Sequence, residues 1–212
     1  MSYLVPNVIE TTPKGERVAD VFSRLLSERI VFVGTPIDDG VANVVVAQIL
    51  HLAAESQHDI HLYVNSPGGS FSAMLAIYDT MQFVGCDLAT LCVGQAASTA
   101  AMLLAAGAPG KRSMLPHSRV VLHQPHTDVR RGSITDLTLE ATELELIRAE
   151  SEDILALHTG RTADEIRDDT DRALVLRADD AVSYGLVDQV MRRAPRRGAD
   201  VVRAIAPQES EA

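Results

Sequence analysis

The sequence predicts an α/β fold made of successive strand–helix units and followed by one long helix that projects from the body. Strand-like and helix-like apolar segments alternate through the first 125 residues, a pattern typical of largely parallel, buried strands. The next part of the chain is highly charged and carries leucines at steps of three or four residues, as an amphipathic helix does. With 212 residues, the chain is most simply one domain, which we place at residues 1–191.

Each unit begins with a short apolar run and continues with a helical pattern. Residues 29–34 (RIVFVG) form the first predicted strand, because Val and Ile dominate the run and a glycine ends it. In the segment that follows, Val45, Ile49, Leu50 and Ala53 are predicted to fall on one helical face. The alternation continues with a strand at 59–69, a helix at 71–84, a strand at 87–94, a helix at 98–110 and a strand at 118–125.

The long helix is predicted at about residues 133–158. It begins at a Ser133 or Thr135 cap and stops at Gly160. A helix of up to about 25 residues would be about 38 Å long at a rise of 1.5 Å per residue, so its apolar stripe needs a partner, such as another subunit. The alternative is that it packs lengthwise on its own domain. Two short helices and a final strand should follow, and residues 192–212 are expected to form a flexible tail.

Composition and charge argue against several classes of function. The net charge of −10 and the aromatic content of 4% argue against nucleic acid as a partner. There is no run of about 18 apolar residues to span a membrane, and the first residues lack the pattern of a signal peptide. Cys86 and Cys92 lie in apolar surroundings, and buried free thiols suit a reducing compartment. We therefore expect a cytoplasmic protein that binds neither membranes nor nucleic acid.

The segment VNSPGGS (64–70) lies between a predicted strand and a predicted helix. Gly68 and Gly69 can adopt backbone conformations closed to other residues and can bring N–H groups close to a ligand. With a helix start beside them, they form a candidate oxyanion or anion site. The alternative is an ordinary strand-to-helix turn.

Two further residues carry candidate chemistry. Ser98 has Ala96 and Ala100 on either side, like the small residues that permit the sharp turn of a nucleophilic serine; the alternative is a helix cap. His123 follows three apolar strand residues and precedes Gln-Pro, which places it at the mouth of a strand. It can serve there as a general base or as a structural histidine. No histidines show metal-ligand spacing, so we expect no metal site.

These segments together resemble the proteolytic subunit of the Clp protease (ClpP). The matching stretches span residues 4–190 in the family's order: VIETTPKGER, SRLLSERIVFVG, IDD, YVNSPGGS, GQAAS, HQP, TGR and AVSYGLVD. The resemblance implies a ClpP/crotonase-like spiral of strand–helix units with a protruding handle helix. It also implies that Ser98 is the nucleophile and His123 its general base. The backbone N–H groups of Gly69 and Thr99 would form the oxyanion hole, with the peptide lying as an added strand beside Gly68.

The resemblance further implies two stacked heptameric rings of identical or paralogous subunits that meet through the handle helix. A hexameric AAA+ unfoldase would dock on the outer face, use ATP and feed in polypeptide substrates, so this chain itself needs no cofactor. The family's docking pocket normally includes two tyrosines; here the positions read His61 and Tyr63, with Phe83 as another member.

The chain departs from the family at the third member of the catalytic triad. The family usually reads Asp-Arg-Asp where this sequence has Asp171, Arg172 and Ala173. Asp171 is the nearest carboxylate, although neighbouring side chains in a strand point to opposite faces; Asp168 and Asp169 are further candidates. Losing the orienting carboxylate costs on the order of 10⁴ in rate.

A second departure is the segment HTDVRRGS (126–133), which replaces the family's glycine-rich loop and is about one residue longer. Three interpretations remain open. The chain is an active serine peptidase, or a weakly active or inactive paralogue with a structural or regulatory role in a mixed tetradecamer, or an acyl-CoA enzyme of the crotonase type. The last would not require the Ser98 and His123 motifs.

Overall fold

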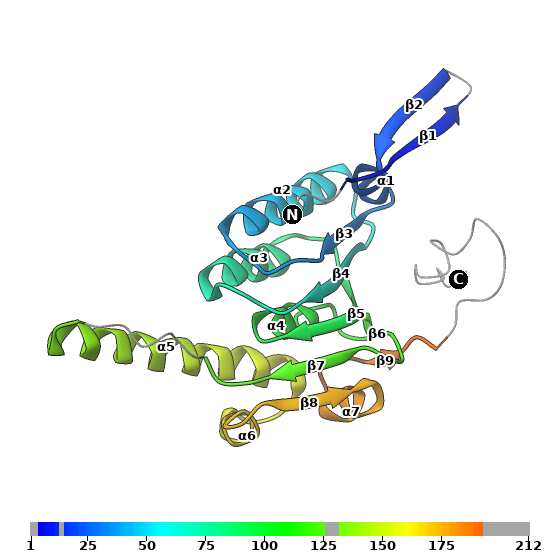
Figure 1. Ribbon diagram of the computed structural model, residues 1–212. Coiled ribbons are helices and arrows are strands. Elements are labelled where there is room, and N and C mark those ends of the chain that lie inside the picture. Colours follow the sequence, from blue (N-terminus) through cyan, green and yellow to red (C-terminus); the bar gives the residue numbers. More distant parts are fainter. Residues whose placement is uncertain (1–3, 13–14, 126–131, 193–212) are drawn as a thin grey trace.

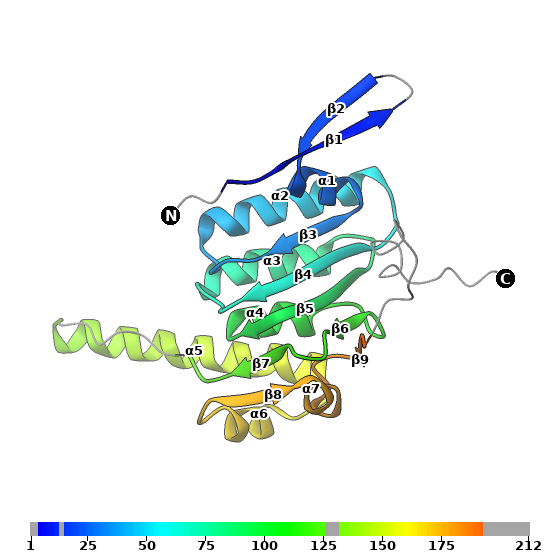
Figure 2. The same cartoon turned by 45° about the vertical axis from the view of Figure 1, so that its right-hand side comes forward.

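A mostly parallel sheet of seven strands organises the structure (Figures 1 and 2). The computed structural model describes residues 4–12, 15–125 and 132–192. The strands are β1 (Asn7–Thr12), β2 (Gly15–Asp20), β3 (Ile30–Val33), β4 (Ile60–Ser66), β5 (Leu88–Ala97), β6 (Arg112–Met114), β7 (Arg119–Leu122), β8 (Leu174–Arg177) and β9 (Gln189–Val190). The helices are α1 (Val21–Ser27), α2 (Asp39–Glu55), α3 (Phe71–Phe83), α4 (Thr99–Ala105), α5 (Ile134–Thr159), α6 (Ala163–Asp169) and α7 (Ala178–Tyr184).

The predicted alternation of strands and helices is confirmed between β3 and β7. Parallel pairing runs from β3 through β4 and β5 to β6 and β9, while β7 extends the far end of β5. Helices α2, α3 and α4 lie along one face of this sheet (Figure 2), where they bury an apolar core. The most completely buried side chains include Ile49, Leu62, Val64, Met74, Ile77 and Leu104.

Two short strands and the N-terminal hairpin were not predicted. Strand β6 has only three residues and β8 only four, too few to show a period. Strand β8 runs antiparallel to β7, with Leu174 opposite Leu122. The strand pair β1–β2 is antiparallel and extends away from the sheet (Figure 1).

The long helix α5 projects beyond the sheet in both views, as predicted (Figures 1 and 2). It begins with a capping box between Ser133 and Asp136 and ends at Gly160, whose φ is 75°, so both predicted limits hold within a residue or two. Its buried residues all lie in the second half of the helix. Lengthwise packing on its own domain is therefore wrong for the first half, where exposed apolar side chains include Ile134, Leu137, Leu139 and Leu146.

Other predictions fall partly outside the described residues. The tail from residue 193 and residues 126–131 of the altered loop lie there. Within the described ranges, no helix is both long enough and apolar enough to cross a membrane.

Candidate functional site

Ser98 lies at the junction between β5 and α4, in a strained backbone conformation. Its φ is 54° and its ψ is −125°, and among the described residues only Arg29 is another non-glycine with a positive φ. Such a conformation costs about 1–3 kcal/mol and persists only where its surroundings impose it. Although Ser98 precedes the helix, its side chain makes no capping hydrogen bond. The alternative of a helix-capping serine is therefore wrong.

The neighbouring chain segments impose this turn. The Ser98 N–H donates to the Val121 carbonyl at 2.8 Å, which ties the turn to β7. A Cβ on Gly68 would lie 2.6 Å from the Ala97 carbonyl oxygen and 2.9 Å from the Ser98 Cβ. Gly68 also has a φ of +92°, so only glycine lets the two segments approach this closely. The turn at Gly68 therefore holds its segment close to Ser98, besides connecting a strand to a helix.

Gly69 lies against the backbone of Ile37 in an isolated parallel bridge. The bridge uses the Gly68 carbonyl, which accepts from the Ile37 N–H at 3.0 Å, and the Ser70 N–H, which donates to the Ile37 carbonyl at 2.8 Å. The Gly69 N–H takes no part in these two bonds. Thr99, the residue after Ser98, is the first residue of α4. The N–H groups of a first helical turn have no partner within the helix.

His123 directly follows β7 and is partly buried. Its Nδ1 lies 2.9 Å from the backbone carbonyl oxygen of Gln124. Because a carbonyl only accepts hydrogen bonds, Nδ1 carries the proton in the neutral ring and Nε2 keeps its lone pair. The Nε2 atom is thus in the form that a general base requires.

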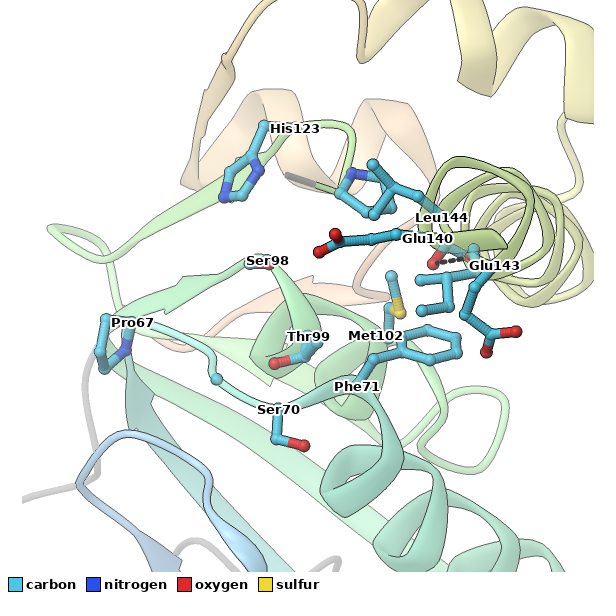
Figure 3. Close-up of a pocket in the computed structure, with 14 residues that line it drawn as sticks. Pro67, Ser70, Phe71, Ser98, Thr99, Met102, His123, Glu140, Glu143 and Leu144 are labelled. Carbon is cyan, nitrogen blue, oxygen red and sulfur yellow. Dashed lines mark hydrogen bonds between the residues drawn. The ribbon is translucent and has the colours of Figure 1, made fainter. Parts of the chain in front are cut away.

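One pocket of about 580 Å³ joins these groups, with both Ser98 and His123 among its lining residues. Figure 3 shows the two side chains facing the same hollow, with Glu140 reaching towards them from α5. The part of the wall beyond them is apolar and comes from Phe71, Met102, Leu144 and Ile147. An apolar cavity with a few polar groups at one end is typical of a ligand-binding pocket.

For three residues that line the pocket, the sequence predicted no side-chain role. Glu140 and Glu143 bring carboxylates from α5 to the pocket, and their spacing of three on an amphipathic helix was the signal available. The buried Thr99 Oγ1 has no hydrogen-bond partner among the described residues, whereas the sequence predicted a role only for the Thr99 N–H.

The candidate carboxylates near position 173 are held in different surroundings. Asp171 lies in a bend before β8, so the strand expected at position 171 is wrong. The Asp171 side chain is 69% exposed, and its Oδ2 lies 3.9 Å from the Arg172 Nε. Asp169 accepts a hydrogen bond from the Tyr184 hydroxyl at 2.8 Å, and Asp168 is exposed. Ala173 is exposed and immediately precedes β8.

The predicted docking residues divide between two elements. His61 and Tyr63 share one face of β4, because both alternate with buried neighbours. Burial lowers the pKa of His61 and raises the pKa of Tyr63 to about 12. Within the part of the chain that the structure describes, the buried Tyr63 hydroxyl has no hydrogen-bond partner. Phe83 is the last residue of α3 and is 82% exposed.

Comparison with known proteins gives a consistent result. A sequence model of the family described as Clp protease matches residues 13–194. The ATP-dependent Clp protease proteolytic subunit 2 of Streptomyces avermitilis is 57% identical over 193 residues, which cover 91% of this chain and 96% of the relative. Subunit 4 of Rhodococcus jostii is 58% identical (89% and 97% covered), and subunit 1 of Corynebacterium glutamicum is 52% identical (89% and 91% covered). The chain therefore belongs to the Clp protease family of proteolytic subunits, which are peptidases.

Proposed function

We propose that this chain is a serine-type endopeptidase that cleaves unfolded polypeptides as a subunit of a Clp protease. The observation that carries the proposal is the Ser98 turn. Its hydroxyl does not cap the helix that follows, its backbone is held at a positive φ, and it lines one pocket with His123. A capping or packing role would require neither the strain nor the pocket.

The geometry supports a two-step acyl transfer. The Ser98 Oγ attacks the scissile carbonyl while His123 Nε2 takes its proton and then delivers that proton to the leaving amine. The N–H groups of Gly69 and Thr99 stabilise the oxyanion, and the peptide lies as an added strand beside Gly68. Water, activated by the same imidazole, then releases the acyl group from Ser98.

The proposed assembly is two stacked heptameric rings, made of this chain alone or together with paralogous subunits. The apolar side chains on the first half of α5 support this, because a partner ring would cover them. We further propose that an ATP-driven AAA+ unfoldase docks near His61, Tyr63 and Phe83, and that the protein acts in the cytoplasm, whose reducing conditions suit its buried thiols Cys86 and Cys92.

A fluorophosphonate probe tests the catalytic proposal. The purified protein is treated with the probe, alone and mixed with a paralogous subunit of the same cell, and the labelled residue is located by mass spectrometry. We expect labelling of Ser98 and its loss in Ser98→Ala. If Ser98 stays unlabelled in both samples, the proposal is wrong.

A second candidate function is a structural or regulatory subunit in a mixed tetradecamer, and the specific observation in its favour is Ala173. Under this alternative the protein joins rings with an active paralogue and raises that partner's activity, while Ser98→Ala changes nothing. Comparing peptide hydrolysis by mixed rings that carry either wild-type chain or Ser98→Ala separates the two functions.

A further inference from the structure

We propose that a second pocket of this chain, which we call the arginine pocket, binds the phosphate group of a small phosphate monoester. Its volume is about 450 Å³, within the range of small-molecule sites. Its polar lining comes from β4, β5, β7, β8 and the turn before β7, and consists of Asn65, Gln95, His117, Arg119 and Arg177. Among the described residues, the arginine pocket shares no lining residue with the pocket of Ser98 and His123. The inference therefore concerns a separate site and goes beyond the proposed function.

Two arginines on adjacent strands form the centre of this pocket. Arg119 of β7 and Arg177 of β8 are directly opposite each other in the antiparallel ladder, and both are exposed. Directly opposed residues point to the same face with Cβ atoms about 4.5–5.5 Å apart, where like charges destabilise the strand pair. In the part of the chain that the structure describes, neither guanidinium forms an ion pair. A bound anion would remove the repulsion between them.

The pocket has no negative charge of its own to fill this role. The chain has a net charge of −10, yet the described residues that line the arginine pocket include no carboxylate. An anionic ligand therefore meets two positive charges there without a competing acidic side chain.

Amide groups add donors to the two guanidiniums. Arg119 Nη2 donates to the Gln95 Oε1 at 3.0 Å, which fixes that guanidinium and uses one of its five N–H groups. The Asn65 Oδ1 accepts from the Gln95 backbone N–H at 3.3 Å, so the Asn65 amide keeps its Nδ2 as a donor. A Cβ on Gly94 would lie 2.7 Å from this Oδ1, so a glycine at position 94 gives the amide its place.

The charge of this donor set fits a phosphate group better than a carboxylate. Guanidinium groups match phosphate oxygens with paired N–H donors. A phosphate monoester carries about −1.5 to −2 charges at pH 7 and so balances two arginines, whereas a carboxylate carries one. Val175 also lines the pocket and is 55% exposed. Its side chain provides an apolar surface for the organic part of the ligand.

Titration calorimetry and thermal unfolding of the full-length protein test the inference, with phenyl phosphate as the probe. We expect phenyl phosphate to bind roughly tenfold more tightly than the monoanion phenylacetate at matched ionic strength. It should also raise the melting temperature, because a ligand of the folded state stabilises that state. Inorganic phosphate lacks the phenyl group and should bind more weakly than phenyl phosphate. Equal affinity for phenyl phosphate and phenylacetate, or for phenyl phosphate and inorganic phosphate, would overturn the assignment.

Arg177→Gln and Arg119→Gln each remove one charge of the pair. Both should weaken phenyl phosphate binding by roughly tenfold or more. In chloride alone, Arg177→Gln should melt no lower than wild type, because the repulsion across the ladder is gone.

Arg172→Gln is the matched control, since the Arg172 side chain is 96% exposed and does not line the pocket. It should bind phenyl phosphate like wild type. The same loss of affinity in Arg172→Gln as in Arg177→Gln, or no binding by wild type, would overturn the inference. Binding is measured without peptide hydrolysis, so an unreactive Ser98 would contradict the proposed function and leave this result unchanged.

Discussion

At the scale of single residues, the site depends on glycines whose missing side chains cannot be replaced. A Cβ on Gly69 would lie 2.1 Å from the Ile37 carbonyl oxygen and 2.6 Å from the Ile37 nitrogen. Both atoms belong to the backbone, so an added methyl group must displace a chain segment. The Gly69 segment carries one of the two proposed oxyanion donors, the Gly69 N–H.

We expect Gly69→Ala to slow the labelling of Ser98 by about 100-fold, because a displacement near 1 Å at a reacting centre costs about this much. The second-order rate constant for the fluorophosphonate measures the effect. Gly85→Ala is the control, since its Cβ would meet only the end of the Gln57 side chain, at 3.3 Å. Equal labelling rates in the two variants would contradict this role for Gly69.

The strain at Ser98 gives a prediction about stability. Removing the Cβ relieves the backbone strain of a positive φ. The free energy of unfolding of Ser98→Gly should therefore exceed that of Ser98→Ala by about 1 kcal/mol. Both variants lack the nucleophile, which means that the comparison isolates the backbone. Urea unfolding of the two proteins measures the difference, and a Ser98→Gly protein no more stable than Ser98→Ala would show that the turn is relaxed.

At the scale of elements, an ionic cluster ties α5 to α6. The buried carboxylate of Glu152 accepts from Arg148 at 2.8 Å and from Arg167 at 2.7 Å. Burial by itself raises the pKa of Glu152, but hydrogen bonds from Arg167 and Arg148 outweigh burial, and the net pKa lies below its ordinary value. The cluster therefore stabilises the folded state when Glu152 is ionised.

Glu152→Gln should lower the free energy of unfolding by about 2 kcal/mol at pH 7, since it weakens hydrogen bonds to charged partners. A lowered folded pKa means that the contribution is present above the ordinary value of 4.5 and is lost as the pH falls through the lower folded value. Urea titrations between pH 7 and pH 3 should show wild type and variant converging. Exposed Glu150→Gln on the same helix is the control; a gap independent of pH would contradict the prediction.

The same elements show how far the sequence could predict the fold and the site. The long strand–helix units carry their own apolar periods, so they were predictable, as were Ser98, His123 and the glycine turn as candidates. Strand β8 has only four residues, too few for a period, and its pairing with β7 is a long-range contact. The Gln124 carbonyl could not be predicted either, because every residue has a carbonyl and only the fold decides which one meets an imidazole.

At the scale of the whole molecule, α5 is the element that the isolated chain leaves incomplete. Leu139 is 66% exposed in the first half of the helix, whereas the second half packs on the body through buried Ile154 and Leu155. Exposed apolar side chains gathered on one projecting segment indicate a protein interface.

We expect Leu139→Lys to split the proposed double ring into single rings, because a charge buried at an interface without a partner is costly. Native mass spectrometry at micromolar concentration measures the assembly, and circular dichroism checks that the subunit stays folded. Leu139→Met keeps an apolar side chain and should assemble like wild type. An intact double ring in Leu139→Lys would show that this face contacts something else.

The alanine at position 173, where the family usually has the third member of its triad, also has a consequence for covalent inhibition. The same imidazole must activate Ser98 for acylation and a water molecule for deacylation, so the loss of the carboxylate at this position slows both halves of the proposed cycle. An acyl group that reaches Ser98 should then have a long lifetime on the enzyme. Slow-reacting esters and lactones would accumulate on this subunit as stable adducts, and a poor catalyst would become a good covalent trap.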